Sequence, residues 1–170
     1  MTLPISGFDE NNKRISTQQL LQKIYVGLEQ GETEFEVLSS GHHNIGGPFW
    51  TEDGTPLKFT VKNPGQRVGA FGLKGTQITV NGPAPADSGW LNSGAELIIK
   101  GDSGDTTAHC AAGGSIYVAG RVVVDHLGWR DAPVGADNRR RRERIAGGDD
   151  LQRGRGDLGG REVAGAIPAW

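Results

Sequence analysis

Two pairs of neighbouring residues carry side chains of the kind found in catalytic or metal sites. His109 and Cys110 combine a base with a thiol, as nucleophilic catalysis requires. His42 and His43 carry imidazoles, which bind transition metals. Neighbouring residues of a strand point to opposite faces, so neither pair can converge on one atom from a regular strand. We expect Cys110 to be a buried structural residue. We expect His42 and His43 to lie in a turn, and the alternative is that one of them contacts a partner.

A third segment, Gly101-Asp102-Ser103-Gly104-Asp105, has the Gly-Asp-Ser-Gly sequence that surrounds the nucleophilic serine of one protease class. That chemistry needs a histidine base and a carboxylate held by two β-barrels, for which this chain is too short. Asp102 and Asp105 could instead bind Ca²⁺, but a calcium-binding repeat would carry acids at Gly82 and Gly120 too. We expect Asp and Ser here to stabilise a turn.

The glycines of the chain match neither a phosphate-binding loop nor a dinucleotide-binding fingerprint. No Gly-Lys-Ser/Thr follows them, and no alternation of strand and helix surrounds them. The sequence therefore predicts no catalytic, cofactor-binding or metal-binding residues in this chain.

The glycines instead mark an internal repeat. Gly82, Gly101 and Gly120 lie nineteen residues apart, and each closes a short run typical of a β-strand. Another glycine stands seven residues before each of them, at 75, 94 and 113. A repeat of this length is typical of stacked coils of β-strand, a solenoid. A glycine-rich sandwich with coincidental spacing is the alternative.

Stacking at this spacing places like residues above one another. Since side chains alternate along a strand, two ladders are expected to point inward and one outward. An irregular fourth copy, Phe59-Thr60-Val61-Lys62-Asn63, precedes the three, and we expect it to be a capping coil. The inward ladders are Ile78, Leu97, Ile116 and Val80, Ile99, Val118, and the outward one is Thr79, Ile98, Tyr117.

The repeat resembles the GXGXG domain family. The matching sequences are Gly-Gln-Arg-Val-Gly at 65–69 and the three glycine-bounded strands at 75–82, 93–101 and 113–121. The helix that we expect at 16–30 and the Gly41-His42-His43-Asn44-Ile45-Gly46 segment also fit free-standing, glutamate synthase-like members. The resemblance covers roughly residues 15 to 121.

The resemblance implies a right-handed parallel β-helix, a single-stranded solenoid with a 19-residue repeat. It implies a non-catalytic structural or assembly subunit of a glutamate synthase-like oxidoreductase, with no activity alone. FMN and an iron–sulfur cluster would lie in a synthase subunit, and a glutaminase-type subunit would be the other partner. The alternatives are a protein similar to the GXGXG subunit of formylmethanofuran dehydrogenase and a stand-alone ligand-binding β-solenoid. For the latter, the aromatic-like stacked residues are Phe71, Trp90 and His109.

Three segments are expected along the chain. Residues 1–34 form an N-terminal segment, in which Ser16 and Gln19 make a capping box for a helix over 16–30 that Gly31 ends. We expect that helix to cover one open end of the β-helix. Residues 35–121 form the GXGXG β-helix domain, beginning with a strand at 35–38. Residues 122–170 form an Arg/Gly-rich tail.

The tail departs from the repeat. Ten of the twelve arginines lie at or after position 121, and Arg139 stands where the next closing glycine belongs. Low hydrophobicity with dense charge indicates disorder. Two explanations account for this departure. The reading frame is shifted near Val122, or the tail is genuine and its basic residues bind an acidic partner. Without further coils, the open end of the β-helix is expected to favour self-association.

Charge and hydropathy exclude several classes of protein. A net charge of −2 offers no attraction to nucleic acid. No apolar run reaches the length of a membrane span, and the first residues, Met1-Thr2-Leu3-Pro4, do not resemble a signal peptide. The expected compartment is the cytoplasm.

Overall fold

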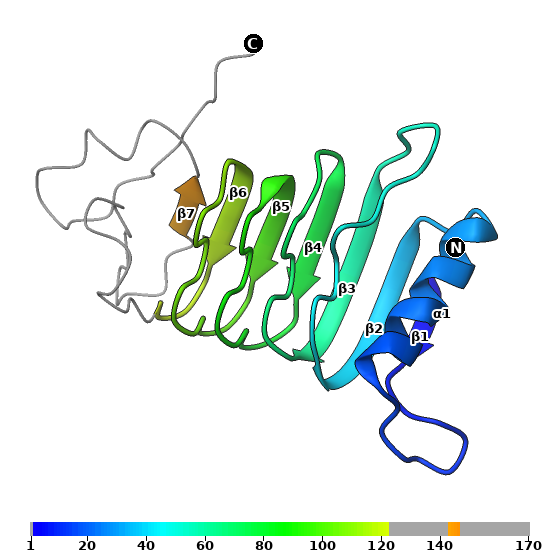
Figure 1. The fold of residues 1–170 in the computed structure, drawn as a ribbon. Coiled ribbons are helices and arrows are strands. Elements are labelled where there is room, and N and C mark those ends of the chain that lie inside the picture. The colour runs from blue at the N-terminus through cyan, green and yellow to red at the C-terminus, as the bar shows by residue number, and fades with distance from the viewer. Residues whose placement is uncertain (1, 123–142, 147–170) are drawn as a thin grey trace, which may run out of the picture.

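The protein is a mainly β chain with one short helix, as a computed structural model shows for residues 2–122 and 143–146 (Figure 1). The seven strands of these residues form one sheet and follow one another across it in chain order. The first six are parallel, and the seventh runs antiparallel to the sixth. The elements are β1 (Leu3–Ser6), α1 (Thr17–Glu29), β2 (Glu34–His42), β3 (Leu57–Pro64), β4 (Thr76–Val80), β5 (Ser93–Ile99), β6 (Gly113–Val118) and β7 (Glu143–Ala146).

The predicted ladders run through the sheet. Ile78, Leu97 and Ile116 occupy matching positions of β4, β5 and β6, and all three are buried. The second inward ladder is equally buried, whereas the predicted outward ladder is partly exposed. The register of β4, β5 and β6 that the sequence predicts is therefore confirmed.

The parallel stack begins earlier than the sequence predicts. Phe59 and Val61 of β3 continue the ladders, but β3 is not a cap, because β2 pairs with its outer edge and β1 pairs with β2. Phe35 of β2 lies opposite Phe59, with the ring centroids 5.1 Å apart. These two residues are twenty-four positions apart rather than nineteen, so the spacing of the repeat does not reveal their pairing. The elements within residues 2–34 thus share one sheet and one core with the later strands.

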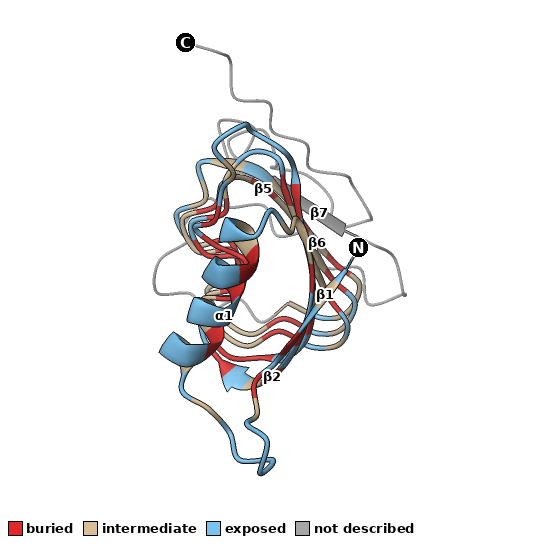
Figure 2. Ribbon diagram, turned by 90° about the vertical axis from the view of Figure 1, so that its right-hand side faces the viewer, coloured by how far each residue is buried: buried red, intermediate tan, exposed pale blue. Residues whose placement is uncertain are grey.

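The connections between strands are stacked as well. Ala84, Ser103 and Val122 pair in parallel from one connection to the next. Further along, the amide of Asp87 donates to the carbonyl of Asp105 at 2.9 Å. Figure 2 shows the buried residues on the inner sides of the sheet and of the connections that face it. The connections from β3 to β4, β4 to β5 and β5 to β6 therefore form a second wall of the same apolar core.

The repeated glycines serve two different purposes. Gly94 has φ +156°, and a Cβ on it would lie 2.9 Å from the backbone nitrogen of Lys74. A Cβ on Gly101 would lie 2.6 Å from the carbonyl carbon of Gly82, so this glycine permits the close approach of two coils. In the third coil the equivalence with Gly94 fails, because Gly113 pairs with Ser93 and the positive φ belongs to Gly114. An irregularity between β5 and β6 accounts for the shift.

The predicted helix is confirmed as α1. Ser16 is its N-cap, and the capping box with Gln19 is present in both directions. Leu20 and Ile24 are fully buried in the core that the strands form. The helix packs against β1 and β2, at the N-terminal end of the stack (Figures 1 and 2). The apolar side of α1 therefore covers the core next to β1 and β2. Next to the later strands, the connections cover that side of the core.

The expected tail lies mostly outside the described residues, including the Arg-rich run that begins at Arg139. The described part is β7, whose four residues pair antiparallel with β6 from Ser115 to Val118. The prediction of disorder falls mainly on residues outside the described part of the chain and stays a prediction. The edge of β6, which the sequence leaves without a partner, accepts this strand.

Candidate functional site

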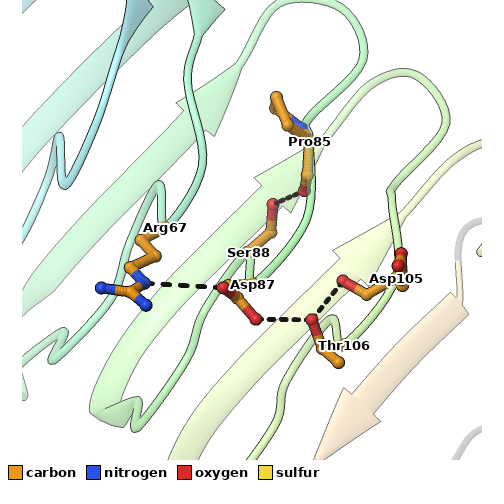
Figure 3. A network of polar contacts seen from close by, with 6 residues as sticks. All are labelled: Arg67, Pro85, Asp87, Ser88, Asp105 and Thr106. Atoms are coloured by element: carbon orange, nitrogen blue, oxygen red, sulfur yellow. Dashed lines mark hydrogen bonds and ion pairs between the residues drawn. The ribbon is translucent and has the colours of Figure 1, made fainter. Parts of the chain in front are cut away.

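A network of polar side chains joins three successive connections (Figure 3). The Nε atom of Arg67 lies 3.5 Å from a carboxylate oxygen of Asp87. The other oxygen of Asp87 accepts a hydrogen bond from the Thr106 hydroxyl at 2.5 Å, and that hydroxyl also lies 2.7 Å from the Asp105 carbonyl. The Arg67 guanidinium lies over the Trp90 ring, 4.8 Å from its centroid.

The network occupies a row of strained backbone positions. Arg67, Asp87 and Thr106 have φ values of +63°, +59° and +55°. Such values are uncommon for residues other than glycine, asparagine and aspartate. The ion pair and the hydrogen bond between neighbouring coils offset part of this cost. We interpret the network as a lateral brace of the coils, since its groups bind one another.

Sequence reasoning missed this network because its spacing is irregular. Asp87 and Thr106 are nineteen residues apart, but Arg67 and Asp87 are twenty apart. The stretch from matching residues of the two strands to this turn is thus one residue shorter after β3 than it is after β4. A search that allows one insertion in each coil would have found the three residues.

The expected aromatic stack is shifted by the same insertion. The Phe71 amide donates to the Trp90 carbonyl, as the Leu91 amide donates to the His109 carbonyl, so Phe71 is equivalent to Leu91 rather than to Trp90. The Phe71 and Trp90 rings still touch, with centroids 5.0 Å apart and planes inclined by 71°. Rings at this angle do not form the flat platform on which a sugar ring would stack.

The segment from Gly101 to Asp105 begins with a bend at Gly101 and forms a parallel bridge at Ser103, so the predicted turn begins only at Asp105. Ser103 is buried, and its hydroxyl lies 2.5 Å from that of Thr107. A carboxylate oxygen of Asp102 accepts a hydrogen bond from the Arg121 amide at 2.8 Å. The Asp102 carboxylate thus joins two neighbouring coils. The Ser103 hydroxyl bonds within its own connection and lies beside a threonine rather than a histidine base.

His42 is the last residue of β2 and is buried, whereas His43 follows in a bend and is exposed. The Ser40 amide donates to Nδ1 of His42 at 3.0 Å, and Nε2 lies 2.9 Å from the Ile15 carbonyl oxygen. Because an amide can only donate, Nδ1 must accept, and Nε2 carries the proton. Burial lowers the pKa of His42. His42 is therefore a neutral structural link between β2 and the segment before α1, rather than an ordinary turn residue.

His109 and Cys110 lie in a turn, not in a strand, and Cys110 has φ +55°. The thiol of Cys110 is exposed, so the expectation of a buried cysteine is wrong. In the described residues, no group of three or more His, Cys, Asp or Glu side chains gathers where it could hold a metal ion.

Two grooves flank α1. One, of about 660 Å³, lies between α1 and the segment after β1, with Phe8, Ile15 and Val26 among its lining residues. The other, of about 920 Å³, lies between the end of α1 and the connection from β2 to β3. Tyr25, Leu28 and Trp50 supply the apolar part of this second groove.

The comparisons leave the family open. No family model, curated protein or solved structure matches the chain. The described part of the chain contains no helix that is long and apolar enough to cross a membrane.

Proposed function

We propose that the chain is a right-handed parallel β-helix of the GXGXG family, and that it acts as a non-catalytic assembly subunit of a glutamate synthase-like oxidoreductase complex. It would hold a flavin- and iron–sulfur-bearing synthase subunit and a glutaminase-type subunit in a fixed relative position. The cofactors and the reacting groups would belong to those subunits.

One observation carries the proposal, namely the double stacking of the glycine-bounded repeat. The strands β3 to β6 pair in parallel at nineteen-residue offsets, and their connections pair with one another on the other side of the core. Pairing on both sides of the core is what a β-helix requires, and this pattern supports the proposal. Of the chemically competent side chains that the sequence offers, Ser103 bonds to Thr107 within its own connection, and His42 links β2 to the segment before α1. Both side chains thus have structural partners, which favours a scaffold over an enzyme.

A reconstitution experiment tests this function. The full chain is produced with a glutamate synthase-like flavin and iron–sulfur subunit and a glutaminase-type subunit. We expect the three to purify as one complex and glutamine-dependent glutamate formation to fall when the chain is left out. A complex that forms and works equally well without the chain would contradict the proposal. Specific purification with a molybdopterin-type enzyme instead would support the formylmethanofuran dehydrogenase alternative.

A second measurement concerns the isolated chain. We expect it to show no flavin absorbance and no glutaminase activity. A yellow protein, or one that hydrolyses glutamine, would show that the chain itself carries part of the chemistry.

A further inference from the structure

The groove at the end of α1 exposes aromatic rings to solvent. Trp50 is 63% exposed and Tyr25 is 42% exposed, and both line the groove with the partly buried Leu28. A single exposed aromatic residue is common, whereas several that line one groove mark a surface for binding.

The groove is also acidic. Its lining includes the carboxylates of Glu29, Glu52 and Asp53 and contains no lysine, arginine or histidine. None of these three carboxylates forms an ion pair within the described part of the chain, where the ion pairs involve Glu34, Glu36 and Asp87 instead. Hydrogen bonds from Thr55 lower the pKa of Asp53. The groove thus joins apolar rings to negative charge that the described residues do not neutralise.

The loop that carries Trp50 is anchored. Phe49 is buried, and its ring lies 5.0 Å from that of Tyr25 and 5.5 Å from that of Phe59. The Asp53 carboxylate accepts hydrogen bonds from the amide and the hydroxyl of Thr55. These contacts hold Trp50 at the groove, so a ligand would lose little loop entropy on binding.

We propose that this groove binds an arginine side chain on a segment of a partner protein, with the guanidinium stacked on Trp50. The argument is charge complementarity together with shape. A planar cation stacks on an aromatic face and its alkyl stem covers apolar surface, while the three rim carboxylates balance its charge. Arginine suits the site better than lysine because its guanidinium is planar and more weakly hydrated. This inference goes beyond the proposed function and does not depend on which complex the chain joins.

The test uses the full chain and the peptide acetyl-Gly-Arg-Gly-Arg-Gly-amide, followed by NMR at the indole N–H of Trp50, which a Trp50→Phe variant assigns. We expect that signal to shift on titration. The same peptide with citrulline in place of arginine, which is planar but neutral, should bind more weakly.

Matched variants locate the binding. Glu29→Gln combined with Glu52→Gln should weaken the peptide on the order of five- to tenfold, as expected for two exposed charges. Glu36→Gln combined with Glu96→Gln removes two charges from the outer face of the sheet and should leave the affinity unchanged. Neither pair of glutamates holds the loop or the core, so both variants should fold.

Three results would overturn the proposal. The first is a citrulline peptide that binds as well as the arginine peptide. The second is equal weakening by the two double variants, which would indicate general attraction to an acidic protein. The third is an absence of binding to the native chain. If the peptide then binds once Arg139, Arg140, Arg141 and Arg142 are replaced by serine, the occupant is the chain's own arginine run rather than a partner.

Discussion

At the scale of the residue, His42 links stability to pH. Nδ1 of His42 accepts a hydrogen bond from the Ser40 amide, and Nε2 donates one to the Ile15 carbonyl. Protonation of Nδ1 would break the hydrogen bond from the Ser40 amide. Burial, which disfavours the charged imidazolium, holds the pKa of His42 in the folded state below the ordinary 6.5. Below pH 6.5 the unfolded chain takes up this proton more readily than the folded chain does. The contribution of His42 is complete above pH 6.5 and is lost as the pH falls towards the lower pKa of the folded state.

We predict that His42→Gln reduces the loss of stability between neutral and mildly acidic pH. Urea unfolding at a series of pH values measures the free energy of unfolding for the native chain and the variant. His43→Gln is the control, because His43 is exposed and should leave the slope unchanged. A slope that His42→Gln does not alter would mean that other groups control the acid sensitivity.

At the scale of the element, the sequence predicts what depends on local pattern. The capping box from Ser16 to Gln19 and the β-type runs at nineteen-residue spacing suffice to place α1, β4, β5 and β6. The pairing of β1 with β2, and of β2 with β3, depends on contacts such as Phe35 with Phe59 across an inserted loop. A fixed spacing cannot reveal pairing of that kind. The brace from Arg67 to Thr106 and the acidic groove were missed for the same reason, since insertions of different length bring their residues together.

The packing of α1 on the sheet gives a prediction at this scale. A Cβ on Gly27 would lie 2.7 Å from Cδ2 of Leu3 and 2.8 Å from Cε1 of Phe35. The Phe35 ring is buried against Phe59 and has little room to move. Gly27→Val should therefore cost about 2 to 3 kcal/mol of stability, as overpacked cores do.

The matched control is Gln22→Val, on an exposed position of the same helix. It introduces the same β-branched side chain without a core contact and should change stability by less than about 0.5 kcal/mol. Chemical denaturation of both variants gives the comparison. Helix propensity alone would favour Val over Gly at position 27, so a loss at Gly27 no larger than that at Gln22 would mean that α1 leaves room for a side chain against β1 and β2.

At the scale of the whole molecule, the two ends of the parallel stack β1 to β6 differ. The β1 edge is four residues long and contains Pro4, which has no amide proton to offer a further strand. The β6 edge is covered by β7, which pairs with Ser115 through Val118. Exposed strand edges recruit other chains, so the native edge at β1 is protected by its sequence and the edge at β6 by β7.

Removal of residues 123–170 should therefore make the chain associate with itself. The shortened chain keeps β1 to β6 and the buried core, but it leaves the backbone groups on the outer edge of β6 without β7. We expect dimers or larger species that grow with protein concentration, measured by sedimentation velocity with a reductant present because Cys110 is exposed. Ser115→Lys in the shortened chain places a charge on that edge strand and should restore monomers, since like charges oppose edge-to-edge pairing. A shortened chain that stays monomeric at all concentrations would mean that the β6 edge needs no cover. Association of the Ser115→Lys form to the same extent would place the contact on another surface.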